Sequence, residues 1–215
     1  MRLAGVANGW LPGLDKLGRL VSSGTKLIAV NNPDNPAGAL IDEARIASIT
    51  DLYERGISTG SMSKPYSLAG LRLGWIVGPA RLLAEVATHG TTTPSASAAS
   101  TTSRPASPWR TRTRASRAHR ITRTNLAVLD EWVTGRDDIT YVKPASGTTA
   151  LLRYSAPVGS HESSPRLLGE IGVMFTPGAA FGIEHTVRIG FADDTATLRA
   201  GLALVGQFFD RLAQD

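Results

Sequence analysis

The sequence contains one stretch, residues 58 to 75, that decides its fold and its chemistry: Ser-Thr-Gly-Ser-Met-Ser-Lys-Pro-Tyr-Ser-Leu-Ala-Gly-Leu-Arg-Leu-Gly-Trp. Lys64 stands among small, hydroxyl-bearing and glycine residues, and no acid lies in the stretch. Such an amine can lose its proton and attack a carbonyl, which forms a Schiff base. The hydroxyls of Ser61 and Ser63 and the planar guanidinium of Arg72 suit a phosphate. The stretch therefore predicts a lysine that reacts with a phosphorylated aldehyde, and the simpler alternative is an ordinary exposed lysine.

This stretch resembles the lysine signature of the class I and II aminotransferases, the pyridoxal-phosphate enzymes of fold type I. The signature reads Ser-x-Ser-Lys, a short spacer and Gly-x-Arg-x-Gly. The matching residues are Ser61, Ser63, Lys64, Gly70, Arg72 and Gly74. The resemblance implies that Lys64 forms a Schiff base with pyridoxal 5'-phosphate and moves a proton as amino groups pass from an amino acid to a 2-oxo acid. It also implies that Ser61 and Arg72 bind the cofactor phosphate, with Ser63 beside them in the cofactor site.

A second stretch, residues 31 to 38, supports the resemblance. It reads Asn-Asn-Pro-Asp-Asn-Pro-Ala-Gly and follows residues 25 to 30, a mostly apolar run that predicts a buried strand. Asparagine and proline favour turns for local reasons, so a simple turn is the alternative interpretation. The family has an Asn-Pro-x-Asn-Pro-x-Gly loop, and the resemblance implies that Asn35 donates a hydrogen bond to the phenolic oxygen of the cofactor ring.

Residues 172 to 182 and 186 to 192 are similar to the closing segment of the same family. In the family, an arginine at the end of a small-domain strand binds the α-carboxylate of the substrate, and Arg188 stands at the matching position. A guanidinium suits a carboxylate because it can donate two parallel hydrogen bonds. Without the resemblance, an arginine in an alternating strand is more often simply solvent-facing.

The composition restricts the class of protein. The chain has 215 residues, of which 42% are hydrophobic, and it has no cysteine. These values are typical of a globular protein in a reducing compartment. No apolar run approaches the roughly 20 residues of a membrane span and no signal peptide is recognised, so we expect a cytoplasmic protein without a membrane segment. The four histidines lack the spacing of metal ligands, so no metal site is expected.

The net charge of +5 comes from one segment, since six arginines and no acid lie between residues 91 and 120. Residues 89 to 120 are rich in Ser, Thr, Ala, Arg and Pro without periodicity, which predicts disorder. A nucleic-acid partner is not expected, because only Trp109 could stack on a base there, although a basic tether for RNA is the alternative. We hypothesise that residues 89 to 118 are translated out of frame, which the other two reading frames of the gene can test.

The order of the expected elements predicts an α/β fold with a partial large domain and a small C-terminal domain. Residues 1 to 88 are expected to form the large domain around a mostly parallel sheet, and residues 121 to 215 a small α+β domain. The expected strands are 25–31, one that begins at residue 57, 73–77, 140–142, 148–154 and 186–191, and the expected helices are 41–55, 80–87, 121–133, 165–171 and 195–212.

The resemblance also implies family features that this sequence does not show. The family has a glycine-rich phosphate loop and a ring-stacking aromatic residue before the region matched here. It also has a strand with a Tyr and an Asp, which pairs with the ring nitrogen, between the Asn-Pro loop and the lysine. Asp42 and Asp51 fall in that interval, but their neighbours match the edges of the gap, so neither is assigned this role. The alternative function is therefore a non-catalytic remnant or binding module of the same fold. For an intact protein the resemblance implies a homodimer.

Overall fold

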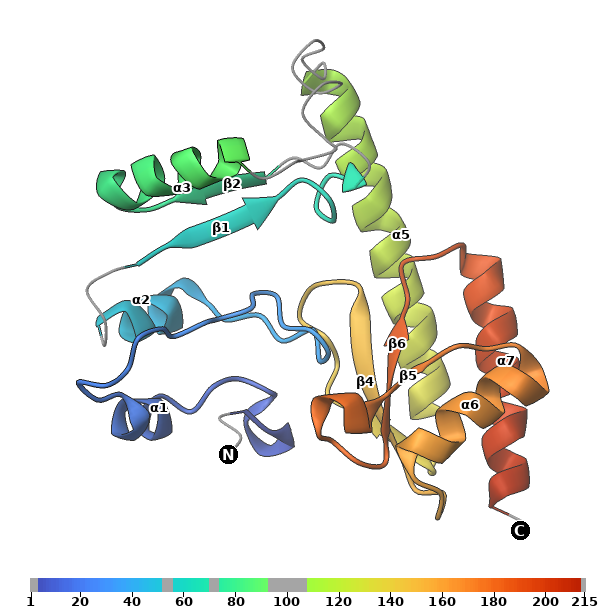
Figure 1. Cartoon of the computed structure of the whole chain (residues 1–215). Coiled ribbons are helices and arrows are strands. Elements are labelled where there is room, and N and C mark those ends of the chain that lie inside the picture. Colours follow the sequence, from blue (N-terminus) through green and yellow to red (C-terminus); the bar gives the residue numbers. More distant parts are fainter. Residues whose placement is uncertain (1–3, 52–55, 70–73, 93–107, 214–215) are drawn as a thin grey trace. The chain divides into compact units, whose positions relative to one another are not determined.

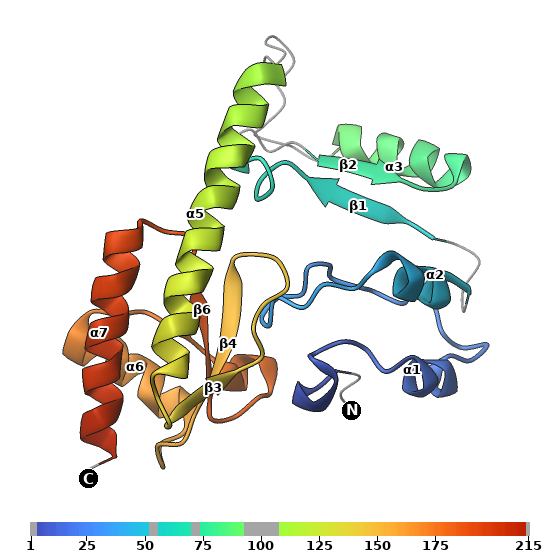
Figure 2. The ribbon, with the colours of Figure 1, turned by 180° about the vertical axis from the view of Figure 1, so that it is seen from behind.

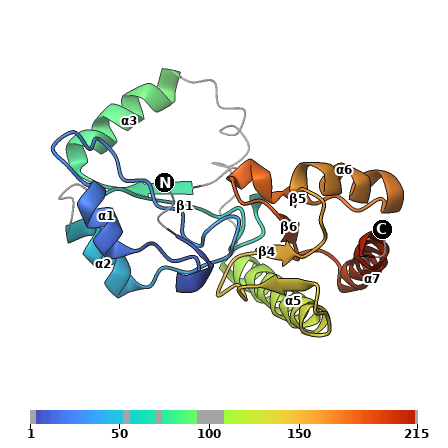
Figure 3. The same ribbon diagram turned by 90° about the horizontal axis from the view of Figure 1, so that it is seen from below.

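The computed structural model describes residues 4–51, 56–69, 74–92 and 108–213. Contacts between Cα atoms divide the chain into two units, one of Met1–Arg45 with Ile121–Asp215 and the other of Ile46–Arg120. Residues 1 to 88, which we expected as one domain, fall into both units. Figures 1 to 3 show the ribbon from three sides, and each unit is described by itself below.

The first unit is built on a four-stranded antiparallel sheet with the order β3-β4-β6-β5. Its strands are β3 (Ile139–Tyr141), β4 (Thr149–Tyr154), β5 (Thr176–Pro177) and β6 (Thr186–Gly190), and its helices include α6 (Ser160–Ile171) and α7 (Thr195–Leu212). Helix α5 (Pro108–Thr134) begins in the second unit and ends in the first. Figures 1 and 2 show α5 and α7 alongside the sheet. The strands predicted at 140–142, 148–154 and 186–191 and the helix predicted at 195–212 are confirmed, whereas β5 was not predicted.

The main hydrophobic core lies between one face of this sheet and the helices. Strand side chains alternate between faces, so Val187 and Ile189 of β6 point into the core while Arg188 points to the other face. Helix α7 contributes Leu198, Leu202, Val205, Phe208, Phe209 and Leu212, a spacing that places apolar side chains on one side of a helix. Asp194 caps α7, because its carboxylate accepts hydrogen bonds from the N–H groups of Ala196 (3.0 Å) and Thr197 (3.1 Å).

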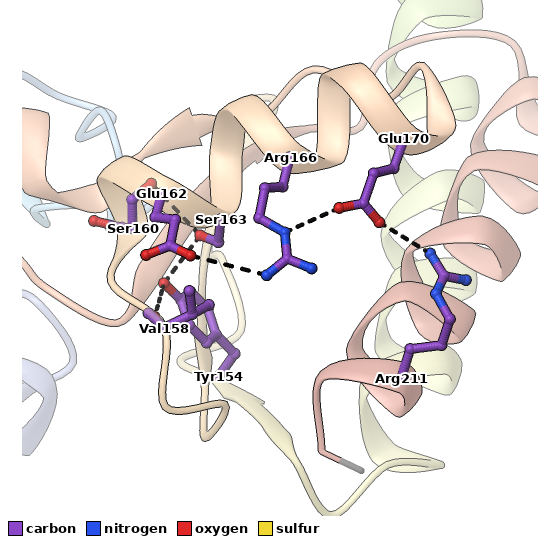
Figure 4. Close-up of polar contacts among 8 residues, drawn as sticks. All are labelled: Tyr154, Val158, Ser160, Glu162, Ser163, Arg166, Glu170 and Arg211. Atoms are coloured by element: carbon purple, nitrogen blue, oxygen red, sulfur yellow. Dashed lines mark hydrogen bonds and ion pairs between the residues drawn. The ribbon is translucent and has the colours of Figure 1, made fainter. Parts of the chain in front are cut away.

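Helices α6 and α7 are also joined by charged groups (Figure 4). Glu170 accepts from Nε of Arg166 at 2.9 Å and from Nη2 of Arg211 at 3.4 Å, which connects the two helices. Tyr154 of β4 donates its hydroxyl to the carbonyl of Val158 at 3.0 Å, and this hydroxyl lies 3.0 Å from Oγ of Ser163 in α6. These contacts hold the helical layer against the sheet that carries Arg188.

The N-terminal part of the first unit contains a short 3₁₀ helix, η1 (Val6–Asn8), and α1 (Leu14–Leu20), followed by loops. The strand predicted at residues 25 to 31 is wrong, because these residues form no strand. Leu27 and Val30 are 74% and 46% exposed. A strand is stable only when a neighbouring strand pairs with its backbone, and no described residues pair with this segment.

The second unit contains an antiparallel pair of strands, β1 (Ser58–Ser61) and β2 (Gly74–Val77), followed by α3 (Ala80–Thr92). Helix α2 (Glu43–Asp51) crosses from the first unit into the second. The expected parallel pairing is not found among the described strands, because the segment at 25–31, which would be a parallel neighbour, forms no strand. The strand expected at 73–77 is present as β2, and all four of its residues are exposed.

The basic segment differs from the predicted disorder at both of its ends. Helix α3 continues to Thr92 and α5 starts at Pro108, while residues 93 to 107 lie outside the described residues. Arginine and alanine favour helix, and extension of the existing helix at residues 121–134 is easier than starting a new one. In the part of the chain that the structure describes, no helix is both long and apolar enough to cross a membrane.

Candidate cofactor and substrate site

Lys64 lies in a turn that begins directly after strand β1. The N–H of Ser67 donates to the carbonyl of Lys64 at 3.2 Å, and the N–H of Leu68 donates to the carbonyl of Met62 at 3.3 Å. Leu68 is buried and anchors the end of the turn. The Lys64 side chain is exposed, and its ammonium has no hydrogen-bond partner among the described residues. The turn therefore leaves this amine accessible to a small aldehyde.

Gly60, just before the lysine signature, and Gly74, at its end, let the strands on either side of the turn approach closely. Gly60 of β1 pairs with Trp75 of β2, and the indole ring of Trp75 lies where a Cβ of residue 60 would be. A Cβ at Gly74 would lie 2.6 Å from the carbonyl oxygen of Gly60. The glycines therefore have a packing role of their own. Arg72, the predicted phosphate ligand, lies outside the described residues, while Ser61 and Ser63 lie on the same short segment as Lys64.

The Asn-Pro loop is a compact turn of the first unit. The side chain of Asn32 accepts from the N–H of Ile41 at 2.9 Å and donates to its carbonyl at 3.1 Å, which closes the loop. Gly38 has φ of +70°, and a Cβ there would lie 2.7 Å from Cβ of Pro144. Only glycine fits this position without strain. The local turn chemistry expected from Asn and Pro is therefore present, and it holds Asn35 at an exposed point of the loop.

The structure brings Asn35 together with Arg188, a residue 153 positions away. Nη1 of Arg188 donates to Oδ1 of Asn35 at 3.0 Å. Nη2 donates to Oγ1 of Thr176 at 2.9 Å, and the guanidinium carbon lies 5.4 Å from the ring centroid of Phe181. Arg188 points away from the main core, over a smaller apolar cluster that includes Leu151, its partner across β4 and β6. The alternative that Arg188 is simply solvent-facing does not describe these contacts.

These contacts determine which donors remain for a ligand. Because Oδ1 of Asn35 accepts from Arg188, the amide nitrogen of Asn35 is left to donate. A guanidinium has five N–H groups, and Arg188 uses one from each terminal nitrogen, so one N–H on each terminal nitrogen and that on Nε remain. Arg188 can thus still bind a carboxylate through two hydrogen bonds while it is held by the protein.

The side chains present fit the groups of pyridoxal phosphate with one exception. The amine of Lys64 suits the aldehyde, the hydroxyls of Ser61 and Ser63 suit the phosphate, and the amide of Asn35 suits the phenolic oxygen. No acid is assigned to the ring nitrogen, and Asp42 accepts a hydrogen bond from the N–H of Arg45 at 2.8 Å at the start of α2. The described residues contain no cluster of three or more side chains suited to a metal ion.

Thr176 and Phe181 contact Arg188, and sequence reasoning did not single them out. Both lie in the segment 172–182 that resembles the family. The contact of Thr176 depends on the pairing of β5 with β6, in which Thr176 stands directly opposite Arg188. No pattern in the sequence indicates the register of a two-residue strand. The sequence does place Thr176 near the strand that carries Arg188, but this proximity does not identify its hydroxyl as the partner of the arginine.

The pyridoxal-phosphate enzymes of fold type I have a lysine in the turn after a strand. They also have an Asn-Pro loop with an arginine beside that loop. The chain belongs to the class I and II aminotransferases, because the sequence model of the family described as Aminotransferase class I and II matches residues 53–203. Members of this family depend on pyridoxal phosphate.

Two curated relatives match nearly the whole chain. Capreomycidine synthase from Streptomyces vinaceus is 31% identical over 234 aligned positions, which cover 93% of this chain and 60% of the relative. Aspartate/prephenate aminotransferase from Thermus thermophilus is 26% identical, with 90% and 59% covered. The chain thus spans about three fifths of these relatives. Since each alignment is longer than the 215 residues of the chain, the relatives have residues without counterparts inside the matched region.

Solved structures show the same fold. A PLP-dependent aminotransferase from Streptococcus suis has a TM-score of 0.83 and 26% sequence identity, covering 97% of this chain and 64% of that one. An aspartate aminotransferase double mutant from Thermus thermophilus has a TM-score of 0.80 at 21% identity, covering 95% and 62%. The α/β fold of type I and the presence of only part of it are therefore confirmed.

Proposed function

We propose that this protein transfers an amino group from an amino acid to a 2-oxo acid, with pyridoxal phosphate bound to Lys64 as a Schiff base and the substrate α-carboxylate bound to Arg188. The observation that carries the proposal is the hydrogen bond of Arg188 to Asn35. It joins the residue expected at the carboxylate with one expected at the cofactor. Family membership supports the type of reaction.

The roles of the side chains follow from their chemistry. Pyridoxal phosphate, when bound, supplies an electron sink for removal of the proton from Cα of the amino acid. The amine of Lys64 anchors the cofactor and, once displaced by substrate, carries that proton as a general base. Arg188 orients the substrate through its carboxylate, and Asn35 donates to the phenolic oxygen. Ser61, Ser63 and Arg72 bind the phosphate.

Arg188 would recognise the α-carboxylate of the substrate and would not determine its side chain. The relatives include proteins named for aspartate, prephenate, kynurenine and arginine, so the family covers different side chains. Arg188 can bind the group that all amino acids and 2-oxo acids share.

A second function, cofactor binding without amino-group transfer, is favoured by two observations. The relatives have residues that find no counterpart within the matched region, and the carboxylate of Asp42 accepts from the N–H of Arg45 at the start of α2. Without an acid at that nitrogen the electron sink is weaker. Such a protein would load pyridoxal phosphate on Lys64 but would not convert it with an amino acid.

Borohydride reduction tests both functions, and release of a 2-oxo acid then separates them. We expect the protein incubated with pyridoxal phosphate and then reduced to carry a stable adduct on the peptide that contains Lys64, as read by mass spectrometry. K64A should lose this adduct, and K26A, which removes another exposed lysine, should keep it. An unmodified Lys64 peptide in the wild-type protein refutes both functions. When an adduct forms, release of a 2-oxo acid from added amino acid distinguishes the catalytic function from binding alone.

Homodimerisation and a cytoplasmic location complete the proposal. Family resemblance supports the dimer, and the lack of cysteines supports a reducing compartment. Sedimentation of the purified protein and fractionation of the source cells are the respective tests.

A further inference from the structure

The side chain of Thr176 is placed to act on Arg188. Thr176 stands directly opposite Arg188 in the antiparallel pair of β5 and β6, and directly opposite residues have Cβ atoms about 4.5–5.5 Å apart. Its Oγ1 accepts from Nη2 of Arg188 at 2.9 Å. This hydrogen bond is partly buried, whereas the one from Nη1 to Asn35 is exposed. The threonine contact is therefore less open to competition from water.

We propose that Thr176 is a positioning residue that fixes the guanidinium of Arg188 for binding a carboxylate. An arginine side chain has many rotamers, and restricting them when a ligand binds costs free energy. Contacts that already restrict the side chain in the free protein lower this cost of binding. Threonine is branched at Cβ and stiff at χ1, so it offers an acceptor in one direction. The ring of Phe181 covers the guanidinium from another side at 5.4 Å. Three contacts thus define one orientation before a ligand arrives.

This orientation keeps the N–H groups that a carboxylate needs. Asn35 and Thr176 take one N–H each, from different terminal nitrogens of Arg188. The remaining N–H on each of these nitrogens can donate to the two oxygens of one carboxylate. A carboxylate is therefore the ligand class that we expect this arrangement to bind. The inference rests on the proposed function, in which that carboxylate belongs to the substrate.

The test compares T176V, which removes the hydroxyl at nearly constant shape, with T176S, which keeps it. The control T140V makes the same change at an exposed threonine of β3. Propionate serves as the carboxylate probe, titrated into the full-length chain and followed by NMR. We expect T176V to bind propionate about five- to tenfold more weakly, because a lost hydrogen bond to a charged group loosens the arginine. T176S and T140V should stay within twofold of the wild type.

A second readout reports the contact itself. The guanidinium signal of Arg188 in ¹⁵N spectra, identified by its loss in R188K, should show faster rotation about the Cζ–Nη2 bond in T176V, and T176S should restore the slow rotation. Equal affinity and equal rotation in T176V and the wild type overturn the inference even when Lys64 forms its adduct. A missing adduct on Lys64, with affinity still dependent on Thr176, overturns the proposed function alone. Wild-type protein that does not bind propionate overturns the inference.

Discussion

Replacement of Asn125 by alanine should destabilise the unit that carries Arg188 more than any surface change. Asn125 lies in α5 and is completely buried. Its amide nitrogen donates to the carbonyls of Phe191 at 2.8 Å and Asp193 at 2.7 Å, and its oxygen accepts from Oγ1 of Thr195 at 2.6 Å. One side chain thus connects α5 to the end of β6 and the start of α7. N125A removes all three hydrogen bonds and leaves their partners without a substitute.

The expected loss in the free energy of unfolding depends on how deeply each hydrogen-bond partner of Asn125 is buried. The carbonyl of Phe191 is in a buried hydrogen bond, and leaving such a group unpaired costs about 1–3 kcal/mol. The bonds to Asp193 and Thr195 are partly buried, so water can replace them at a cost of roughly 0.5–1 kcal/mol each. The sum is about 3 kcal/mol, which lowers Tm by roughly 6–12 °C in a chain of this size.

Thermal unfolding followed by circular dichroism measures this loss. The matched control is N31A, at an exposed asparagine, which should leave Tm within about 2 °C. N125D keeps the shape, but an ionised carboxylate cannot donate to two carbonyls. Burial raises the pKa of that carboxyl, so the penalty of N125D should be larger at pH 7 than near pH 4. A fall of less than about 2 °C in N125A would refute the reasoning, because the three hydrogen bonds would then contribute almost nothing.

The remaining predictions concern a charge pair and two glycines. The hydrogen bond from the Lys143 ammonium holds the pKa of the Asp130 carboxyl below its ordinary value of about 4. The pair therefore stabilises the folded protein at pH values above about 4. This stabilisation disappears as the pH falls through the lower pKa that Asp130 has in the folded protein. D130N should therefore be less stable than the wild type at pH 7 by at most about 1 kcal/mol, with the difference in urea unfolding vanishing in acid; a difference that grows in acid contradicts this. G38A should lower Tm, because φ is +70° and the new Cβ would lie 2.7 Å from Cβ of Pro144. G169A, in the last turn of α6 where a Cβ meets nothing within 4 Å, should raise stability by about 0.4–1 kcal/mol, because alanine loses less conformational freedom on folding. Equal effects of G38A and G169A would contradict this reasoning.

The C-terminal elements could be predicted from the sequence because local and long-range preferences agree there. Helix α7 has an Asp cap, a helical apolar spacing and a sheet to pack against, and its bounds are those expected. The segment 25–31 has strand-forming residues but forms no strand, since pairing depends on a neighbour that its own composition cannot reveal. The part of α5 before residue 121 was not predicted, because its own sequence lacks a helical pattern although it forms a helix. It shows no apolar periodicity, and it forms as a continuation of a helix that does.

The candidate site was predictable to the extent that its residues belong to local motifs. Asn35 and Arg188 were each indicated by a neighbouring pattern, and the structure joins them by a hydrogen bond. Thr176 was not indicated by any pattern, because its contact with Arg188 depends on the register between β5 and β6. Lys64 was indicated by its motif, and the structure adds that buried Leu68 anchors the turn that exposes it.

The residues that we propose for carboxylate recognition and for amine chemistry lie in separate units of this protein, so the two proposed roles can be tested separately. Asn35, Thr176 and Arg188 are joined within the first unit, whereas Lys64 and its turn belong to the second. Substitution of Arg188 should weaken carboxylate binding without changing the reduction of the Lys64 adduct, and K64A should do the reverse. Because amino-group transfer needs both functions on one substrate, a protein that retains each of them separately but transfers no amino group would match the second function proposed above, cofactor binding without transfer.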